Sequence, residues 1–330
     1  MLASVIGIYA WSVQATGAPT YLLSELQQLQ IDPMLGRWLM LGFLVAFIVK
    51  APMVPLHTWL PDAAEHSTPG TATLLVGVLD KIGTFGMIKF CLGLFPEASL
   101  WITPFMVWFA VVSIIWGALG AIGSRNLMRL VSYTSVSHFG FMVLGIYAFT
   151  TASMSGSILY MLNHGFSTAA MFLVVGFMAK RTGSYDIAAY GGVQKVAPVT
   201  AGVLLVSGLS VLSLPGLGPF VSEFMVIAGT WSRYPIVTAV SIIGVVLAAV
   251  YVLRMYQRTM TGPISEATAA QFTGRDLTGV EKAVMVPIIG ILLFLGFVPQ
   301  PAVQLVEPTA KATLAYVGTT DPAPVAKGAK

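Results

Sequence analysis

The sequence predicts an all-α polytopic membrane protein, on three observations: few charges, recurrent long apolar runs, and no alternation within those runs. Of the 330 residues, 56% are hydrophobic and only 9% are charged, whereas soluble globular domains carry about 25% charged residues. Apolar runs near the length of about 20 residues that a membrane helix needs recur along the chain. A β-barrel would alternate in polarity, but the runs LVAFIV (44–49) and GVLLVSGL (202–209) are apolar on every side.

The chain divides into membrane crossings joined by short loops. The first apolar run, Met1 to Thr16, is short for a full crossing and lacks the basic region of a signal peptide, so we expect a span entered partway and a chain that is a piece of a longer one. Eight full crossings are expected at Leu39–Met53, Ala72–Leu94, Pro104–Ile122, Leu127–Phe149, Ser157–Met178, Val199–Trp231, Ile236–Met255 and Val280–Val298.

Two segments are expected outside the membrane, the polar loop from Gln257 to Gly279 and the C-terminal tail. Residues 1–300 form the predicted transmembrane domain, and residues 301–330, rich in Pro, Ala, Thr and Lys, are expected to form a polar, flexible C-terminal tail. Basic residues occupy alternate loops, which we expect to face the cytoplasm and to leave the C-terminus on the extracytoplasmic side. These residues are Arg125, Arg129, Lys180, Arg181, Lys195, Arg254, Arg258, Arg275 and Lys282.

Helix breakers interrupt two of the expected crossings. Pro52 and Pro55 follow Lys50 in the first, and Pro215 and Gly216 interrupt the sixth. A proline removes a backbone donor and clashes with the preceding turn, and such breaks are tolerated in lipid where they are buried or line a wet cavity. A pair of broken helices indicates a transport site, although membrane helices also contain prolines and glycines that only kink them.

Ionisable residues lie inside the expected crossings, where an unpaired charge is costly and usually functional. Lys81 lies near the middle of its crossing and suits reversible protonation. Lys50 follows an apolar run, so its ammonium is expected within the hydrocarbon depth, where it needs a partner or a cavity; the alternative is that it extends toward the headgroups from a nearby helix end. Asp80 points about 100° away from Lys81 around the helix, so these neighbours need not form an ion pair. Glu223 follows the second break and is expected either to carry a proton or to form a structural salt bridge.

Two histidines lie near the centres of their crossings. His138 is flanked by the hydroxyls of Ser135 and Ser137, which could relay protons or bind water. His164 has Ser167 and Thr168 on its helix face, and its alternative role is an interhelical hydrogen bond. A haem held by two histidines is a weaker alternative.

Other functions are excluded by composition. The single cysteine, Cys91, cannot form a disulfide or a CxxC motif, so any iron–sulfur chemistry must belong to other subunits. The net charge of +4 is dispersed over short loops, which argues against nucleic-acid binding. We expect no metal and no cofactor in this chain.

A long motif resembles the antiporter-like, proton-pumping subunits of NADH:quinone oxidoreductase, respiratory complex I. It reads FIVKAPMVPLHTWLPDA from Phe47 to Ala63. Four shorter matches follow in order: Lys81-Ile-Gly83, Ser132 to Gly140, Asn163-His164-Gly165, and Leu214-Pro-Gly216 through Phe220 to Phe224. The chain is most similar to the subunit M branch, because Glu223 stands where the sister subunits L and N typically carry lysine.

The resemblance implies a proton route along the membrane midplane. It assigns Lys50 as the pumping lysine, Lys81 as the central connector, His138 and His164 as relay, and Glu223 as the exit group. The family fold has fourteen spans with inverted repeats, of which this chain supplies about nine. A glutamate on an earlier helix pairs with the Lys50 equivalent in the family, and we expect no residue in this chain to replace it.

The resemblance also implies a setting. The chain would lie in the plasma membrane of a bacterium as a multi-pass subunit beside the L and N subunits, with NADH, FMN, iron–sulfur clusters and quinone bound in partner subunits. Two alternatives stay open: a subunit of a multi-subunit sodium/proton antiporter, and a structural membrane scaffold.

Overall fold

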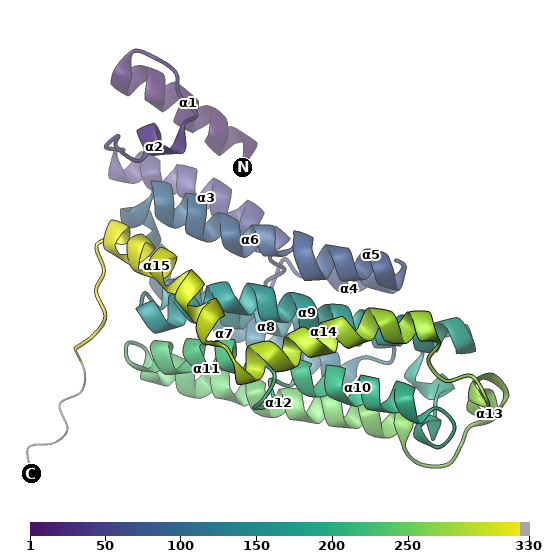
Figure 1. Cartoon of the computed structure of the whole chain (residues 1–330). Coiled ribbons are helices and arrows are strands. Elements are labelled where there is room, and N and C mark those ends of the chain that lie inside the picture. Colours follow the sequence, from purple (N-terminus) through teal and green to yellow (C-terminus); the bar gives the residue numbers. More distant parts are fainter. Residues whose placement is uncertain (324–330) are drawn as a thin grey trace, which may run out of the picture.

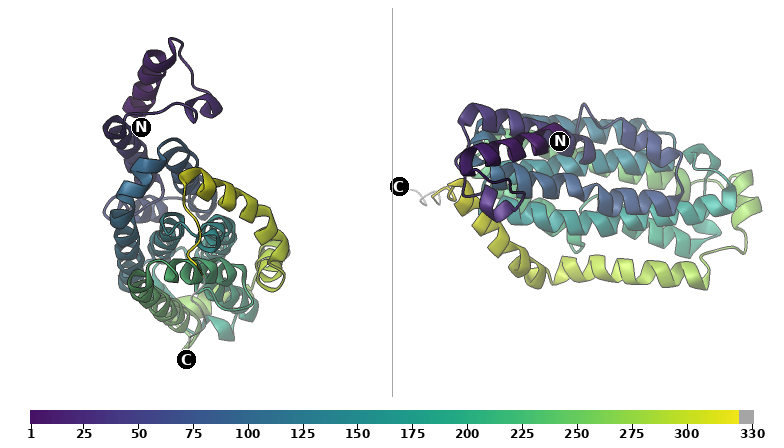
Figure 2. Two further views of the ribbon diagram at one scale, coloured as in Figure 1. Left: turned by 90° about the vertical axis from the view of Figure 1, so that its left-hand side faces the viewer. Right: turned by 90° about the horizontal axis from the view of Figure 1, so that it is seen from above.

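The fold is an all-helical bundle, as the sequence predicts. In the computed structural model, which describes residues 1–323, these residues form helices and loops without a strand. The longer helices run roughly along one direction, and the left panel of Figure 2 shows them nearly end-on. Helices α1 and α2 lie at one edge of the bundle, where α1 packs against α3 (Figure 1).

The helices follow one another along the chain with short connections. The N-terminal part comprises α1 (Leu2–Thr16), α2 (Leu23–Leu26), α3 (Pro33–Lys50), α4 (Trp59–Glu65), α5 (Pro69–Leu74), the π-helical η1 (Leu75–Leu79), α6 (Lys81–Gly86), the π-helical η2 (Met87–Leu92) and α7 (Pro96–Gly123). The remainder comprises α8 (Leu127–Tyr147), α9 (Thr151–Thr182), the 3₁₀ turns η3 (Ile187–Ala189) and η4 (Val193–Lys195), α10 (Pro198–Val211), α11 (Gly218–Trp231), α12 (Pro235–Met260), α13 (Glu266–Phe272), α14 (Gly279–Phe297) and α15 (Gln300–Val317).

Six of the described helices are long and apolar enough to cross a membrane individually, namely α3, α7, α8, α9, α12 and α14. A seventh span arises if the segment Ile187–Lys195 is joined to α10, across a bend of 115°. The expected crossing Ala72–Leu94 is instead a string of short α- and π-helical segments, and Val199–Trp231 is split into α10 and α11. Interrupted helices are therefore the reason that this number is below the eight crossings expected.

Both predicted helix breaks are present. Helix α3 ends at Lys50, and Ala51 is extended before the turns that carry Pro52 and Pro55. Helix α10 ends at Val211, and the chain resumes as α11 at Gly218. In Figure 1 the two halves α10 and α11 lie toward opposite ends of the bundle, with the break between them.

The basic loops gather at one end of the bundle, next to α13 (Figure 1). Backbone hydrogen bonds join them: the amide of Leu127 donates to Tyr185, and that of Ile187 donates to Arg125. The amide of Gly192 donates to Thr261. This grouping agrees with the charge pattern, and the assignment of that end to the cytoplasm stays a prediction.

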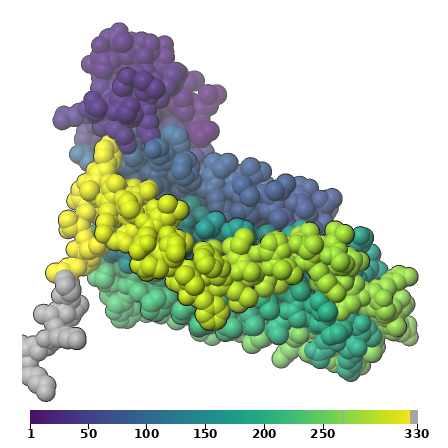
Figure 3. Space-filling model, in the orientation of Figure 1, coloured from purple at the N-terminus to yellow at the C-terminus, as the bar shows by residue number. Residues whose placement is uncertain are grey.

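The expected flexible tail, residues 301–330, begins within helix α15, and the expectation of flexibility was wrong for residues 301–317. Helix α15 buries Ala310, Leu314 and Val317, whose spacing of three and four residues makes one apolar face. The sequence composition hides this period because Pro, Thr and Lys fill the other faces. Figure 3 shows α15 covering the surface beside α14. Residues 324–330 of the predicted tail lie outside the described residues.

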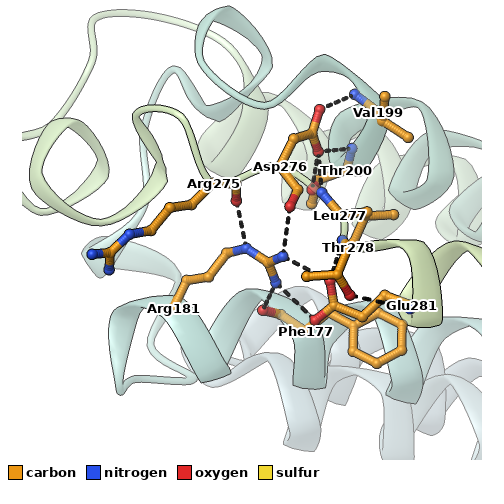
Figure 4. Close-up of polar contacts among 9 residues, drawn as sticks. All are labelled: Phe177, Arg181, Val199, Thr200, Arg275, Asp276, Leu277, Thr278 and Glu281. Carbon is orange, nitrogen blue, oxygen red and sulfur yellow. Dashed lines mark hydrogen bonds and ion pairs between the residues drawn. The ribbon is translucent and has the colours of Figure 1, made fainter.

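A buried ion pair stabilises the end of the bundle where the basic loops lie. Arg181, near the end of α9, contacts the carboxylate of Glu281 on α14 through both terminal nitrogens, at 3.1 and 2.7 Å. The same guanidinium donates to the carbonyls of Arg275 and Asp276 (Figure 4). Both charged side chains are more than nine-tenths buried. Arg181 thus ties α9 to the start of α14 and to the loop before it.

Asp276 connects the same loop to α10. Its carboxylate accepts hydrogen bonds from the backbone amides of Val199 and Thr200 and from the Thr200 hydroxyl (Figure 4). Burial raises the pKa of Asp276, but these hydrogen bonds together outweigh it and hold the pKa below its usual value. The interaction therefore stabilises the fold at neutral pH and is lost only as the pH falls through that lowered pKa.

We expect Arg181→Met to destabilise the protein by about 3 kcal/mol, because it leaves the buried carboxylate of Glu281 without its cation. Thermal unfolding of the detergent-purified protein, followed by circular dichroism, measures the effect. The neighbouring exposed cation supplies the control, Lys180→Met, which should unfold like the wild type. Equal stability of the two variants would contradict a structural role for the Arg181 pair.

Candidate functional site

The first ionisable group of the predicted set, Lys50, has an acidic partner. Its ammonium lies 3.0 Å from Oδ1 of Asp80, which is fully buried, and 5.5 Å from the centre of the Trp59 ring. The expectation that no residue of this chain pairs with Lys50 was therefore wrong. The partner comes from the next membrane segment along the chain, where Asp80 joins η1 to α6.

Lys81 points in another direction and has no carboxylate within ion-pair distance among residues 1–323. Its ammonium donates to the carbonyl of Val76 and lies 2.7 Å from Nδ1 of His164. The ring of Phe139 lies 5.3 Å from the ammonium. The prediction that Asp80 and Lys81 do not form a simple pair is confirmed, since each contacts a different partner.

The π-helical turn η1 explains these directions. A π turn adds one residue per hydrogen-bonded ring and commonly occurs at functional sites. The amide of Asp80 donates to the carbonyl of Leu75, five residues earlier. The ammonium of Lys81 donates to the carbonyl of Val76, which is also five residues earlier. The extra residue rotates Asp80 and Lys81 relative to the helix that precedes them.

The two histidines lie against each other. The ring centres of His138 on α8 and His164 on α9 are 5.2 Å apart and nearly perpendicular. Nε2 of His164 lies 3.1 Å from the Thr168 hydroxyl, as its place on the same helix face predicts. The hydroxyls of Ser135 and Ser137 beside His138 donate to the backbone carbonyls of Val131 and Ile114, and their role in proton relay stays a prediction.

Glu223 is buried on α11 and is held by hydroxyls. Tyr160 on α9 and Ser213 in the second break both donate to its Oε2, the latter at 2.8 Å. In residues 1–323 no cation lies within ion-pair distance of Glu223, so the salt-bridge alternative is not what this structure contains. Tyr160 also lies beside the histidines, 5.7 Å between ring centres from His138 and 6.4 Å from His164.

The second break is closed by contacts from two neighbouring helices. The Asn163 side chain on α9 donates to the carbonyl of Gly218, at 2.8 Å, and to the hydroxyl of Ser222. Gly216 has a φ of 96°, which glycine adopts without strain. Gly296 on α14 packs directly on Gly216, and a side chain there would overlap the Gly216 carbonyl. These contacts fix the conformation of the break, which places Ser213 within hydrogen-bond distance of Glu223.

Together these contacts make one row of groups across five segments of the bundle. The predicted residues Lys50, Lys81, His138, His164 and Glu223 are all in it, and Asp80, Tyr160 and Ser213 fill the intervals. Lys50 is hydrogen-bonded to Asp80, and the groups from Lys81 to Glu223 are each in hydrogen-bond or ring contact with the next. Asp80 and Lys81 are linked as sequence neighbours, without contact between their side chains. Such a row can pass protons from one titratable group to another.

An apolar groove of about 540 Å³ reaches Lys81 from the side. Its lining is mostly hydrophobic and comes from α5, η1 and α9, including Val78, Leu162 and Phe166. Protons require polar carriers, so we expect Lys81 to exchange its proton with His164 and not through this groove. Among the described residues, no group of three His, Cys, Asp or Glu side chains could hold a metal ion.

Comparison with known proteins identifies the family. A family model described as "NADH:quinone oxidoreductase/Mrp antiporter, TM" matches residues 1–250. The chain belongs to this family. Within the NADH:quinone oxidoreductase/Mrp antiporter family, a relative from Mycobacterium tuberculosis, NADH-quinone oxidoreductase subunit M, is 49% identical over 98% of this chain and 59% of its own length. The protein of the same name from Escherichia coli K12 is 34% identical over 91% of this chain and 59% of its length.

Solved structures agree with this membership. A chain of respiratory complex I from Thermus thermophilus with bound NADH matches with a TM-score of 0.88 and 29% identity, over 96% of this chain and 66% of that one. A chain of the Mrp complex from Dietzia sp. DQ12-45-1b matches with a TM-score of 0.80 and 22% identity, over 96% and 67%. The second match shows a shared fold alone. This chain spans about three fifths of the length of its curated relatives.

Sequence reasoning missed three members of the row for different reasons. Asp80 was noticed but related only to its neighbour Lys81, because the π turn that directs it toward Lys50 leaves no sequence signal. Tyr160 and Ser213 resemble ordinary membrane tyrosines and serines until the break places them on Glu223. One available signal was the spacing of Tyr160 and His164, four residues apart on one helix face.

We expect Gly296→Ala to destabilise the second break by about 1–3 kcal/mol, because the added methyl group overlaps the Gly216 carbonyl. Thermal unfolding in detergent measures the loss. Gly290→Ala on the same helix is the matched control, since the structure leaves open space around it. A Gly296→Ala protein as stable as the control would contradict the close packing of α14 on the break.

Proposed function

We propose that this chain is a proton-translocating membrane-arm subunit of a NADH:quinone oxidoreductase. The observation that carries the proposal is the row of titratable groups from Lys50 to Glu223: Lys50 is paired with Asp80, and the groups from Lys81 to Glu223 are in hydrogen-bond or ring contact. The names of the relatives from Mycobacterium tuberculosis and Escherichia coli support the choice of complex.

The chemistry of the row follows from its contacts. A protonated Lys81 can donate to Nδ1 of His164, which leaves a neutral amine and an imidazolium. Tyr160 can pass its hydroxyl proton to Glu223 while accepting another from the histidine side, so that its own charge is unchanged at the end of the step. Lys50 and Glu223 are the ends at which protons enter and leave.

The driving force comes from outside the chain. Electron transfer from NADH to quinone takes place in partner subunits, which bind FMN and the iron–sulfur clusters, and it changes the charge on the neighbouring membrane subunits. That change alters the protonation of Lys50 and then of the groups behind it, because charges at low dielectric act over long distances. This chain contributes no redox centre.

The setting completes the proposal. The chain lies in a bacterial plasma membrane between antiporter-like subunits of the L and N type, with its basic end in the cytoplasm and its C-terminus outside. The grouping of the basic loops at one end supports this orientation.

Sodium/proton antiport is the competing function, because the family description includes Mrp antiporters. The identity levels favour the oxidoreductase: 49% to a subunit M protein against 22% to the Mrp chain. Inverted membrane vesicles separate the two. NADH-driven acidification without a sodium requirement supports the oxidoreductase, and sodium-dependent proton exchange without bound NADH dehydrogenase subunits supports the antiporter.

We expect Lys50→Ala to lower NADH-driven proton pumping by about tenfold or more, because the titratable group that is paired with the buried Asp80 and whose charge moves the proton onward is lost. Pumping is measured as quenching of a pH-sensitive dye in inverted vesicles, per assembled complex counted by NADH:ferricyanide activity. Lys282→Ala, at an exposed position on α14, is the control. Pumping by Lys50→Ala at the control rate would refute the assignment, and a scaffold role predicts that outcome.

The hydroxyl of Tyr160 gives a second, isosteric test. Tyr160→Phe keeps the ring and removes the donor to Glu223, and we expect it to slow pumping about tenfold with normal assembly. Tyr147→Phe is matched to it, since Tyr147 is equally buried and its hydroxyl has no partner in residues 1–323. If both variants pump alike, protons do not pass through Tyr160.

A further inference from the structure

Asp80 has a position that the row described above does not explain. It lies between the two lysines of the row, adjacent to Lys81 in sequence and hydrogen-bonded to Lys50 in space. It is fully buried, at 0% exposure, at the junction of the π turn η1 and helix α6. The acid is thus inside the apolar bundle with a lysine on either side.

The charges around Asp80 do not balance. One carboxylate can neutralise one ammonium, and in this structure it contacts that of Lys50. The ammonium of Lys81 is bound only by neutral groups, namely the Val76 carbonyl and the His164 ring. If both lysines are protonated, one positive charge is in excess, and an excess charge in a buried site is expensive.

A purely structural pair between α3 and α6 would look different. A buried carboxylate that only joins two helices is expected to have both oxygens satisfied. Oδ2 of Asp80 is buried and has no hydrogen-bond partner in residues 1–323. One third of the Lys50 side chain is exposed, so its ammonium can exchange protons with water.

We propose that Asp80 is the shared counter-charge of Lys50 and Lys81 and couples the protonation of one to that of the other. The inference rests on the proton-translocating function proposed above. When Lys50 gives up its proton, the carboxylate loses its partner and stabilises the protonated form of Lys81 instead. When Lys81 passes its proton to His164, the carboxylate favours a new proton on Lys50. Asp80 stays ionised throughout, so it positions charge and carries no proton.

Asp80→Asn tests this in the full complex, in inverted vesicles. It keeps the shape of the side chain and removes the charge, and we expect pumping per assembled complex to fall about tenfold or more. NADH:ferricyanide activity should be unchanged, because that reaction bypasses the membrane arm. Asp80→Glu restores the charge and should recover most of the pumping. Glu97→Gln, at an exposed acid in the first turn of α7, is the control and should pump normally.

The infrared difference spectrum between resting and NADH-energised complex adds a readout that a structural role would not change. We expect the frequency of a carboxylate band to shift on energisation, and that band to lie at a different frequency in Asp80→Glu. Asp80→Glu keeps the buried charge pair, so this readout does not depend on whether Asp80→Asn folds. A band that stays constant, or Asp80→Asn pumping like the control, would overturn the inference. If Lys50→Ala also pumps normally, the proposed function itself fails; if Lys50→Ala is inactive and Asp80→Asn pumps, only the role of Asp80 fails.

Discussion

The ammonium of Lys81 in the interior of the bundle can be stable only if acceptors surround it, and the helices nearby are arranged to supply them. The carbonyl of Val76 comes from a π turn in the same segment, and the imidazole of His164 comes from the middle of α9. Removing either would leave a buried charge without its hydrogen bond, at a cost of several kcal/mol. The distance between α6 and α9 is therefore set by a polar contact as much as by apolar packing.

The same requirement explains why irregular backbone is found next to the charged groups. Regular helices satisfy their own amides and carbonyls and offer none to a neighbour. At the break between α10 and α11, Asn163 donates to the carbonyl of Gly218, the first residue of α11, and the break brings Ser213 to Glu223. The π turn η1 serves Lys81 in the same way. Irregularity supplies the polar contacts that a membrane interior otherwise lacks.

Much of this was accessible from the sequence. The two breaks are marked by proline and glycine, and Lys81, His164 and Glu223 stand out because charged and imidazole groups are rare in apolar runs. The contacts between them were not accessible, because they depend on helix rotation. The pairing of Lys50 with Asp80 needs the extra residue of a π turn, whose sequence, LVGVL, looks like any apolar helix. The order of α15 was missed because its apolar face is narrow and its composition is polar.

Helix α9 carries chemistry on two sides at once. His164 contacts the Lys81 segment, Tyr160 contacts Glu223 on α11, and Asn163 holds the break. These three residues are fixed to one rigid rod of 32 residues whose far end is anchored by Arg181. A small twist of that rod would change the contacts with both sides together. A rotation of α9 about its axis would therefore make or break the Lys81–His164 and Tyr160–Glu223 contacts at the same time.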